Sequence, residues 1–327
     1  MTRLILALSA LVAVLFAASL LIGPAGLGLG ESLRALFAGE GGPIVQVMRE
    51  IRLPRAVLGL LVGAVLGLSG AAMQGFLRNP LAEPGLIGIS ASASLGAVIA
   101  LQTGLAAAFA LALPLAALAG AGVAVALVLG LAGPRGGALA LILAGIGISA
   151  LAGALTSLVL NLSPNPFAAI EIVHWMMGSL ADRSMRHVWL AAPLMAGGMA
   201  LLLSLGRGLD ALTLGEDAAQ SLGVDLARLR LWLVIGTAAA VGAAVSVAGA
   251  VGFVGLVVPH LLRPLTGGRP SRLLPAAALG GAAMLLAADV ATRLIAPDRD
   301  LKLGVLTAIV GAPFFLHLIW RLRRVEA

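Results

Sequence analysis

Few residues in this chain belong to the types that usually carry enzyme chemistry, and their spacing suits it poorly. The stretch GLSG places Ser69 between Gly67 and Gly70, as a nucleophile for intramembrane proteolysis would be, and His260 could serve as its base. Small residues at this spacing also let two helices pack closely, and we favour that interpretation. A covalent serine probe distinguishes the two.

Metal and nucleotide chemistry lack their usual patterns. His174, His187 and His317 form no metal-ligand spacing, and cysteine is absent, so we expect no metal site. His174 is either a polar residue at the membrane interface or, alternatively, an axial haem ligand facing an outer vestibule. There is no GxxxxGK[ST] motif, and the one lysine, Lys302, lies outside any glycine-rich loop. We therefore predict no catalytic site and no cofactor in this chain.

One acidic residue, Asp289, lies inside an apolar stretch four residues before Arg293. A charge at membrane depth is costly and is usually paired. Residues four apart share a helix face, so we predict an ion pair between these two side chains. A proton relay through Asp289 is the alternative.

The elements that position these residues must be membrane helices. The 327 residues are 61% hydrophobic and 11% charged, with a mean hydropathy of +1.10. Apolar stretches of about 20 residues recur without the alternation of barrel strands. We predict an all-α polytopic membrane protein in which residues 1–327 form a single transmembrane domain. The net charge of +7 requires no nucleic acid, because membrane proteins keep arginines near the lipid headgroups.

Hydropathy predicts about ten transmembrane helices. The spans are Leu4–Gly23, Ala56–Leu77, Gly88–Thr103, Ala106–Leu131, Ala138–Leu160, Val188–Leu205, Leu231–Val251, Gly252–Leu262, Leu273–Ile295 and Leu303–Trp320. The first is long enough to be a span, and we do not expect it to be a cleaved signal peptide. The eighth is too short to cross about 30 Å, so we predict a half-helix broken at Pro259. Ten spans place both termini on one side, and the arginine distribution favours the cytoplasm.

A weak internal repeat is visible. GAVLGLSGAAMQGFLRNP, from Gly63 to Pro80, aligns with GAAVSVAGAVGFVGLVVP, from Gly242 to Pro259. The matched pairs are Gly63/Gly242, Gly70/Gly249, Ala71/Ala250 and Pro80/Pro259. The two copies fall in the second and seventh spans, which run in opposite directions. We predict an inverted repeat of spans 2–5 and 7–10, an arrangement typical of transporters.

The longest polar connection covers residues 207–230 and far exceeds the usual 2–8 residues between helices. Glu216 and Asp217 suit the first turn of a short helix, and Gly223 suits its C-terminal end. Asp225 then suits the N-cap of a second helix. This pattern predicts a compact knob, which is either a solvated connection or a docking surface for a soluble partner.

Four stretches occur in order between Ile51 and Trp320: IRLPRAVLGLLVGAVLGLSGAAMQGFLRNPLAEPGLIGIS, LTLGEDAAQSLGV, GFVGLVVPHLLRPLTG and LGVLTAIVGAPFF. Together they resemble the FecCD/BtuC-type permease family, the membrane subunits of bacterial ABC importers for iron–siderophore, haem and cobalamin. The resemblance implies a BtuC-like, type II importer fold in the bacterial inner membrane. It also implies a homodimer, two cytoplasmic ABC ATPase subunits that bind ATP and Mg, and a periplasmic substrate-binding protein.

The resemblance also implies roles for three groups of residues. The ATPase-coupling residues are Leu212, Leu214, Gly215, Glu216, Ala219, Ser221, Leu222, Gly223 and Val224. The cytoplasmic gate is Asn79, Pro80 and Leu81 in the irregular stretch RNPLAEPGLIG. Irregular backbone is tolerated at membrane depth where it lines a cavity. An ordinary turn after the second span is the alternative. The binding-protein docking residues are Arg52, Arg55 and Arg293, with snorkelling to headgroups as the alternative.

The cargo is not fixed by these patterns. Iron–siderophore is favoured because it is the largest group in the family. The stretch HWMMGS is close to what cobalamin permeases carry, which makes cobalamin second and haem third. Outside the family, a stand-alone secondary transporter is the alternative, and it would require acidic or histidine residues in mid-span.

Overall fold

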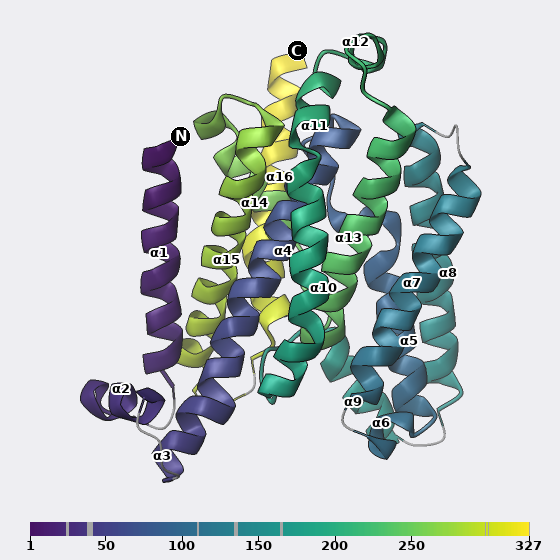
Figure 1. Cartoon of the computed structure of the whole chain (residues 1–327). Coiled ribbons are helices and arrows are strands. Elements are labelled where there is room, and N and C mark those ends of the chain that lie inside the picture. The colour runs from purple at the N-terminus through teal and green to yellow at the C-terminus, as the bar shows by residue number, and fades with distance from the viewer. Residues whose placement is uncertain are drawn as a thin grey trace.

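The computed structural model describes residues 1–23, 26–37, 42–109, 111–133, 137–163, 166–297, 299 and 301–326, without the side chains of 29, 166–168, 319 and 321–326. All regular structure in these ranges is helical (Figure 1). The predicted all-α membrane fold is therefore confirmed.

Seven helices in the described ranges are long and apolar enough to cross a membrane. They are α1 (Thr2–Leu21), α4 (Leu53–Leu77, continuous with preceding turns from Pro43), α7 (Ala112–Ala132), α8 (Ala138–Asn161), α10 (Met185–Ser204), α13 (Leu226–Ala248) and α15 (Pro270–Ile295). The remaining predicted spans coincide with α5 (Ile89–Gln102), α14 (Val254–Leu262) and α16 (Leu303–Glu326). At 1.5 Å per residue α14 is roughly 13 Å long, so it reaches through only part of a bilayer.

Short elements connect these helices. They are α2 (Leu29–Phe37), α3 (Pro43–Gln46), a π-helical stretch (Val47–Arg52), α6 (Leu105–Ala108), α9 (Pro166–Met176), α11 (Gly206–Leu212), α12 (Glu216–Ser221) and two 3₁₀ turns, Pro84–Ile87 and Pro264–Thr266. Figure 1 places α12 and both chain termini at one end of the bundle, which we call the α12 end. The opposite end carries α2, α3, α6 and α9, and we call it the α9 end.

Helix contacts follow the inverted repeat. The contact of α4 with α15 is matched by that of α13 with α7, and the contact of α5 with α7 by that of α14 with α15. Likewise α5 contacts α8 as α14 contacts α16. Helices α4 and α13 run in opposite directions (Figure 1). The residue alignment itself does not carry over, because Gly70 lies inside α4 whereas Gly249 ends α13.

The predicted break at Pro259 is wrong, because Pro259 lies inside a continuous α14. The chain breaks earlier, where Gly249 and Phe253 adopt positive φ angles of 69° and 67°. A proline inside a helix leaves the carbonyl four residues back without its donor. Here that carbonyl, on Gly255, faces the Gln74 side-chain amide at 3.5 Å, and the same amide donates to the next carbonyl along α14 at 3.2 Å. A side chain from another helix therefore compensates for the proline.

The GLSG stretch packs helices closely, as the favoured interpretation predicted. A Cβ on Gly67 would collide with the Ala277 carbonyl of α15, and one on Gly70 would collide with the Gly255 carbonyl of α14. These glycines therefore let the backbones of α14 and α15 approach two faces of α4.

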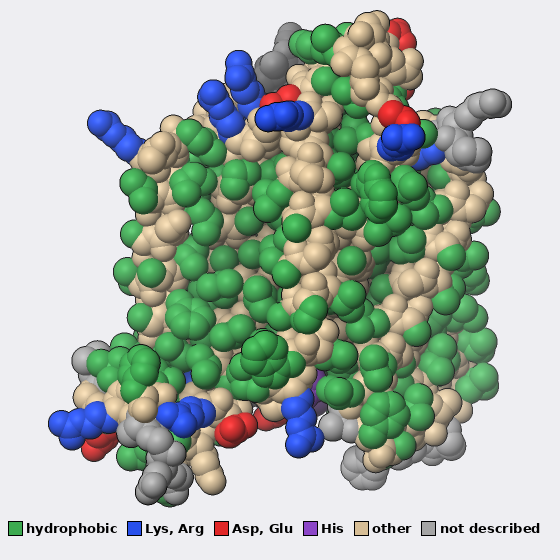
Figure 2. All heavy atoms as spheres, in the orientation of Figure 1, with side chains coloured by type: hydrophobic (Ala, Val, Ile, Leu, Met, Phe, Trp, Pro, Cys, Tyr) green, Lys and Arg blue, Asp and Glu red, His purple; other side chains and the backbone are tan. Residues whose placement is uncertain are grey.

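The surface agrees with a bilayer location. Figure 2 shows hydrophobic side chains across the middle of the visible face, with lysine, arginine and acidic side chains gathered at its two ends. Helix α1 is the least enclosed of the long helices, with only Val12 and Ser19 buried. It packs mainly on α15.

Candidate functional site

The predicted knob is formed as expected at the α12 end. Helix α12 starts with Glu216 and Asp217 in its first turn. Gly223, with a φ of 84°, follows its last turn and donates its N–H to the Gln220 carbonyl at 2.8 Å. The Asp225 carboxylate then caps α13 by accepting the Arg228 N–H at 3.0 Å. Figure 1 shows α12 projecting beyond the bundle.

The predicted coupling residues divide into two sets by exposure. Ala219 is fully buried and Leu212 is 2% exposed, so these two side chains hold the knob against the bundle. Leu214 and Leu222 are 69% and 65% exposed at a polar end of the molecule. Leu214 and Leu222 lie just before and just after the projecting helix α12, and exposed apolar side chains at such a place suit a binding surface. Of the other predicted coupling residues, Glu216, Ser221 and Gly223 are exposed, whereas Gly215 and Val224 are half-buried.

Two polar contacts connect the knob to long helices. Asp210 of α11 accepts hydrogen bonds from the Ser271 N–H at 2.8 Å and the Ser271 hydroxyl at 2.5 Å, which caps the start of α15. Glu216 lies 3.6 Å from Arg78, the residue that ends α4 in a left-handed conformation. A displacement of the knob would therefore reach both α4 and α15.

The predicted gate residues form a turn at the end of α4. Asn79 accepts the Leu81 N–H on its side-chain oxygen at 2.9 Å, and its own N–H donates to the Gln74 carbonyl at 3.3 Å. Asn79 is exposed, while Pro80 and Leu81 are half-buried. The structure thus shows a hydrogen-bonded turn at the α12 end.

Glu83, which no sequence pattern singled out, connects the turn after α4 with the irregular segment between α13 and α14. It accepts a hydrogen bond from the Phe253 N–H just ahead of α14. Burial raises the pKa of Glu83, and the hydrogen bond from the Phe253 N–H at the start of the helix lowers it less than burial raises it. Phe253 is a bulky residue with positive φ, a strained conformation that functional sites often retain.

Gln74 and Arg263 form a second unforeseen contact. The Arg263 guanidinium donates to the Gln74 side-chain oxygen at 2.9 Å. Because the amide of Gln74 also faces the carbonyls of α14, this one side chain ties together α4, α14 and the turn after α14. The sequence signal that could have predicted this contact is the polar side chain of Gln74 inside an apolar stretch.

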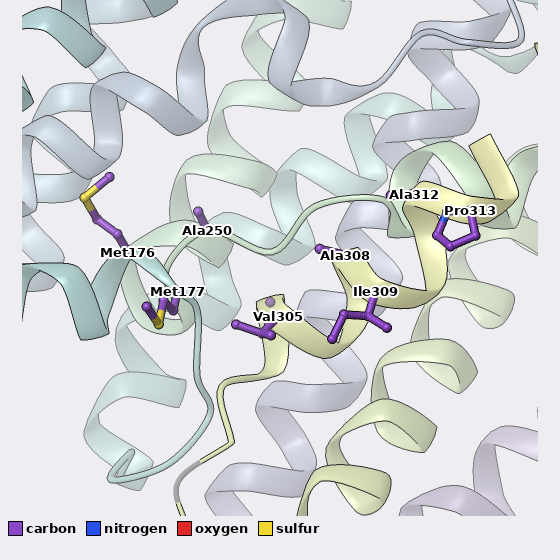
Figure 3. Close-up of a pocket in the computed structure, with 9 residues that line it drawn as sticks. Met176, Met177, Ala250, Val305, Ala308, Ile309, Ala312 and Pro313 are labelled. Carbon is purple, nitrogen blue, oxygen red and sulfur yellow. The ribbon is translucent and has the colours of Figure 1, made fainter. Parts of the chain in front are cut away.

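A large cavity lies beside the break after α13. Its volume is about 680 Å³, and it is lined by Met176 at the end of α9, by Met177 just after it, by Ala250 and by residues of α16 from Gly304 to Pro313 (Figure 3). None of its nine lining residues carries a charge. The cavity can therefore accommodate a large group through apolar contact while offering it no ionic anchor.

The three predicted docking arginines are engaged inside the chain. Arg55 donates to one Asp289 oxygen at 2.8 Å, and Arg293 donates to the other at 2.7 Å. The predicted Asp289–Arg293 pair is confirmed, and Arg55 is an unforeseen third member. Arg52 is 4% exposed and donates to the carbonyls of Leu20 and Leu21 at the end of α1.

The alternative chemistries gain no support from the geometry. The Ser69 hydroxyl is buried and has no hydrogen-bond partner in the described part of the chain, so it forms no dyad there. The His260 ring packs edge-on against Phe314 at 5.7 Å. No cluster of metal-ligating side chains occurs among the described residues. Asp289 has both oxygens occupied by arginines, unlike a free proton carrier.

Comparison with known proteins agrees with this architecture. The sequence model of the FecCD transport family matches residues 11–321. The Fe(3+) dicitrate permease protein FecD of Escherichia coli is 41% identical over 277 residues, which cover 85% of this chain and 86% of that protein. The cobalamin import permease protein BtuC of Halobacterium salinarum is 42% identical over 282 residues, which cover 86% and 75%.

A solved structure has the same fold. An inward-facing metal-chelate type ABC transporter superposes with a TM-score of 0.87 and 32% identity, covering 98% of this chain and all of the other. Sequence and structure agree over nearly the whole length: this chain belongs to the FecCD transport family and is a permease of an ABC importer.

Proposed function

We propose that this chain works as a homodimer with two cytoplasmic ABC ATPase subunits and a periplasmic binding protein, importing a metal chelate across the bacterial inner membrane. The α12 end then faces the cytoplasm together with both termini, and the α9 end faces the periplasm. ATP and Mg bind the ATPase subunits, and this chain holds no cofactor.

The observation that carries the proposal is the knob with Leu214 and Leu222 exposed. Burying a leucine side chain is worth roughly 1.5–3 kcal/mol, so two exposed leucines that flank α12 favour a partner. Because Asp210 and Glu216 contact the starts and ends of long helices, a partner seated on α12 can move α4 and α15.

The gate and the docking surface are further parts of the proposal. Asn79, Pro80 and Leu81 would open and close the path at the cytoplasmic end. Among the predicted docking residues, Arg55 keeps the most accessible side chain, at 20% exposure. Arg34, Arg186 and Arg299 are the exposed arginines of the α9 end, and they would add to a cationic face for the binding protein.

Iron–siderophore is the favoured cargo, with cobalamin and haem as alternatives. The iron-citrate and cobalamin relatives are almost equally similar to this chain, at 41% and 42% identity. The open 680 Å³ pocket has an uncharged lining, which would offer a passing chelate apolar contact and no ionic anchor.

The test is ATP hydrolysis by the chain purified with its co-purifying partners in nanodiscs. Deleting Gly215–Gly223 should uncouple or release the ATPase. A finer variant is Leu222→Ser, matched by Leu162→Ser, because Leu162 is 68% exposed at the opposite end. Leu222→Ser should lower ATPase association about tenfold, which corresponds to losing one buried leucine, whereas Leu162→Ser should not.

If the chain binds no ATPase and the deletion changes nothing, the coupling role is refuted. The stand-alone secondary transporter then becomes the leading alternative, and transport driven by an ion gradient in proteoliposomes would establish it.

A further inference from the structure

A second cavity, of about 270 Å³, lies at the α12 end between the end of α4, the turn after α11 and the start of α15. Its polar lining side chains are Gln74, Arg78, Thr213 and Arg263. The other lining residues are small or apolar, and none is acidic. We call it the Arg263 cavity.

Arg263 has a charge that no acidic side chain among the described residues neutralises. Its guanidinium donates a hydrogen bond to the neutral side-chain oxygen of Gln74, at 2.9 Å. Its Nε is buried without a hydrogen-bond partner, and no carboxylate forms an ion pair with it among the described residues. Burial also lowers the pKa of this guanidinium from its ordinary value. An uncompensated, partly buried cation of this kind is stabilised by an anion.

The nearby acidic side chains contact other residues and do not pair with Arg263. Glu216 lies at the rim, 3.6 Å from Arg78, and both side chains are half-exposed, so their pairing is worth little. Asp210 is held by the backbone and hydroxyl of Ser271. Around the cavity the exposed residues next to Pro270 are Arg269 and Arg272, so the surroundings are cationic as well.

We propose that the Arg263 cavity binds a phosphate group, either the head of an anionic phospholipid or free phosphate. A guanidinium presents its N–H donors in a planar fork that matches phosphate oxygens. Arg263 would contribute the terminal N–H groups of its guanidinium, Arg78 a second guanidinium at the rim, and Thr213 a hydroxyl. The cavity lies at the proposed cytoplasmic end, where the leaflet carries anionic lipids. A bound phosphate would join α4, α11, α14 and α15 beneath the knob.

The test uses the purified full chain with three variants. Arg263→Gln and Arg78→Gln each remove a cation from the cavity. Arg228→Gln is the control, because Arg228 is at the same end, is 80% exposed and pairs only with Asp225 at the surface. Native mass spectrometry then measures retention of phosphatidylglycerol against phosphatidylcholine.

The wild type and Arg228→Gln should prefer phosphatidylglycerol, and the two cavity variants should bind it about tenfold more weakly. In a second arm, inorganic phosphate replaces chloride in melting experiments on delipidated protein. A rise in melting temperature that Arg263→Gln abolishes assigns free phosphate as the ligand, and a lipid effect alone assigns the headgroup.

Equal behaviour of wild type and Arg263→Gln in both arms overturns the proposal. If Arg263→Gln does not fold, Arg78→Gln decides the matter, because Arg78 is half-exposed and its loss leaves the interior unchanged. None of these outcomes depends on which chelate the importer carries.

Discussion

Replacing Asp289 by Asn should destabilise the fold substantially. Asp289 is 1% exposed and forms ion pairs with both Arg55 and Arg293, whose side chains are 20% and 8% exposed. Asn keeps the volume and one acceptor but leaves two neighbouring guanidinium groups without an anion. Removing one partner of a buried ion pair costs about 3–5 kcal/mol. We expect a loss of about 3 kcal/mol, the low end of that range, because water can reach Arg55.

The assay is SDS-induced unfolding of the purified protein in mixed micelles, followed by far-ultraviolet circular dichroism. Asp225→Asn is the matched control, since the same substitution there affects a surface pair with side chains 52% and 80% exposed. Asn also serves as an N-cap, so that change should cost less than about 1 kcal/mol. Equal unfolding midpoints for the two variants would refute the reasoning. Normal stability with weaker binding-protein association would instead show that these arginines face the partner.

Three further substitutions test the packing around α4. Gly67→Ala puts a methyl group against the Ala277 carbonyl and should cost about 1–3 kcal/mol, whereas Gly75→Ala, whose nearest neighbours would be 3.6 Å away, should be neutral or slightly stabilising by the same unfolding assay. Gln74→Leu removes the donor to two α14 carbonyls and should cost about 1–3 kcal/mol, which unfolding midpoints would show; a neutral result would mean that Pro259 needs no compensation. Ser69→Ala should leave ATPase activity and stability unchanged, because the hydroxyl has no hydrogen-bond partner among the described residues, and lost activity would reopen the protease hypothesis.

The sequence predicted those features whose signals are local. Hydropathy located the long helices, and the order of acidic, glycine and aspartate residues predicted the knob with its N-cap at Asp225. The GLSG spacing predicted close helix packing. Each of these depends on residues within a few turns of one another.

Features that depend on distant partners were missed. Pro259 was expected to break its helix, but Gln74, more than 180 residues away in sequence, supplies donors to α14. Arg55 lies against Asp289, 234 residues away in sequence, and no local signal predicted that contact. A single sequence shows the residue types in such pairs and not which of them meet.

The three last carbonyls of α1 reveal how that helix is attached. The Arg293 guanidinium donates a hydrogen bond to the Ser19 carbonyl at 2.8 Å, and the Arg52 guanidinium donates to the carbonyls of Leu20 and Leu21 at 3.0 and 2.9 Å. The last carbonyls of every α-helix lack a partner within the helix, whatever its side chains are. Hydrogen bonds to these carbonyls therefore depend on the position at which the helix ends and only weakly on its sequence. Arg293 also donates to the Ser19 hydroxyl at 2.8 Å, so helix α1 should be interchangeable with an unrelated apolar helix that ends at the same level and keeps a serine at position 19. The rest of the bundle should tolerate such an exchange as long as the replacement helix has the same length.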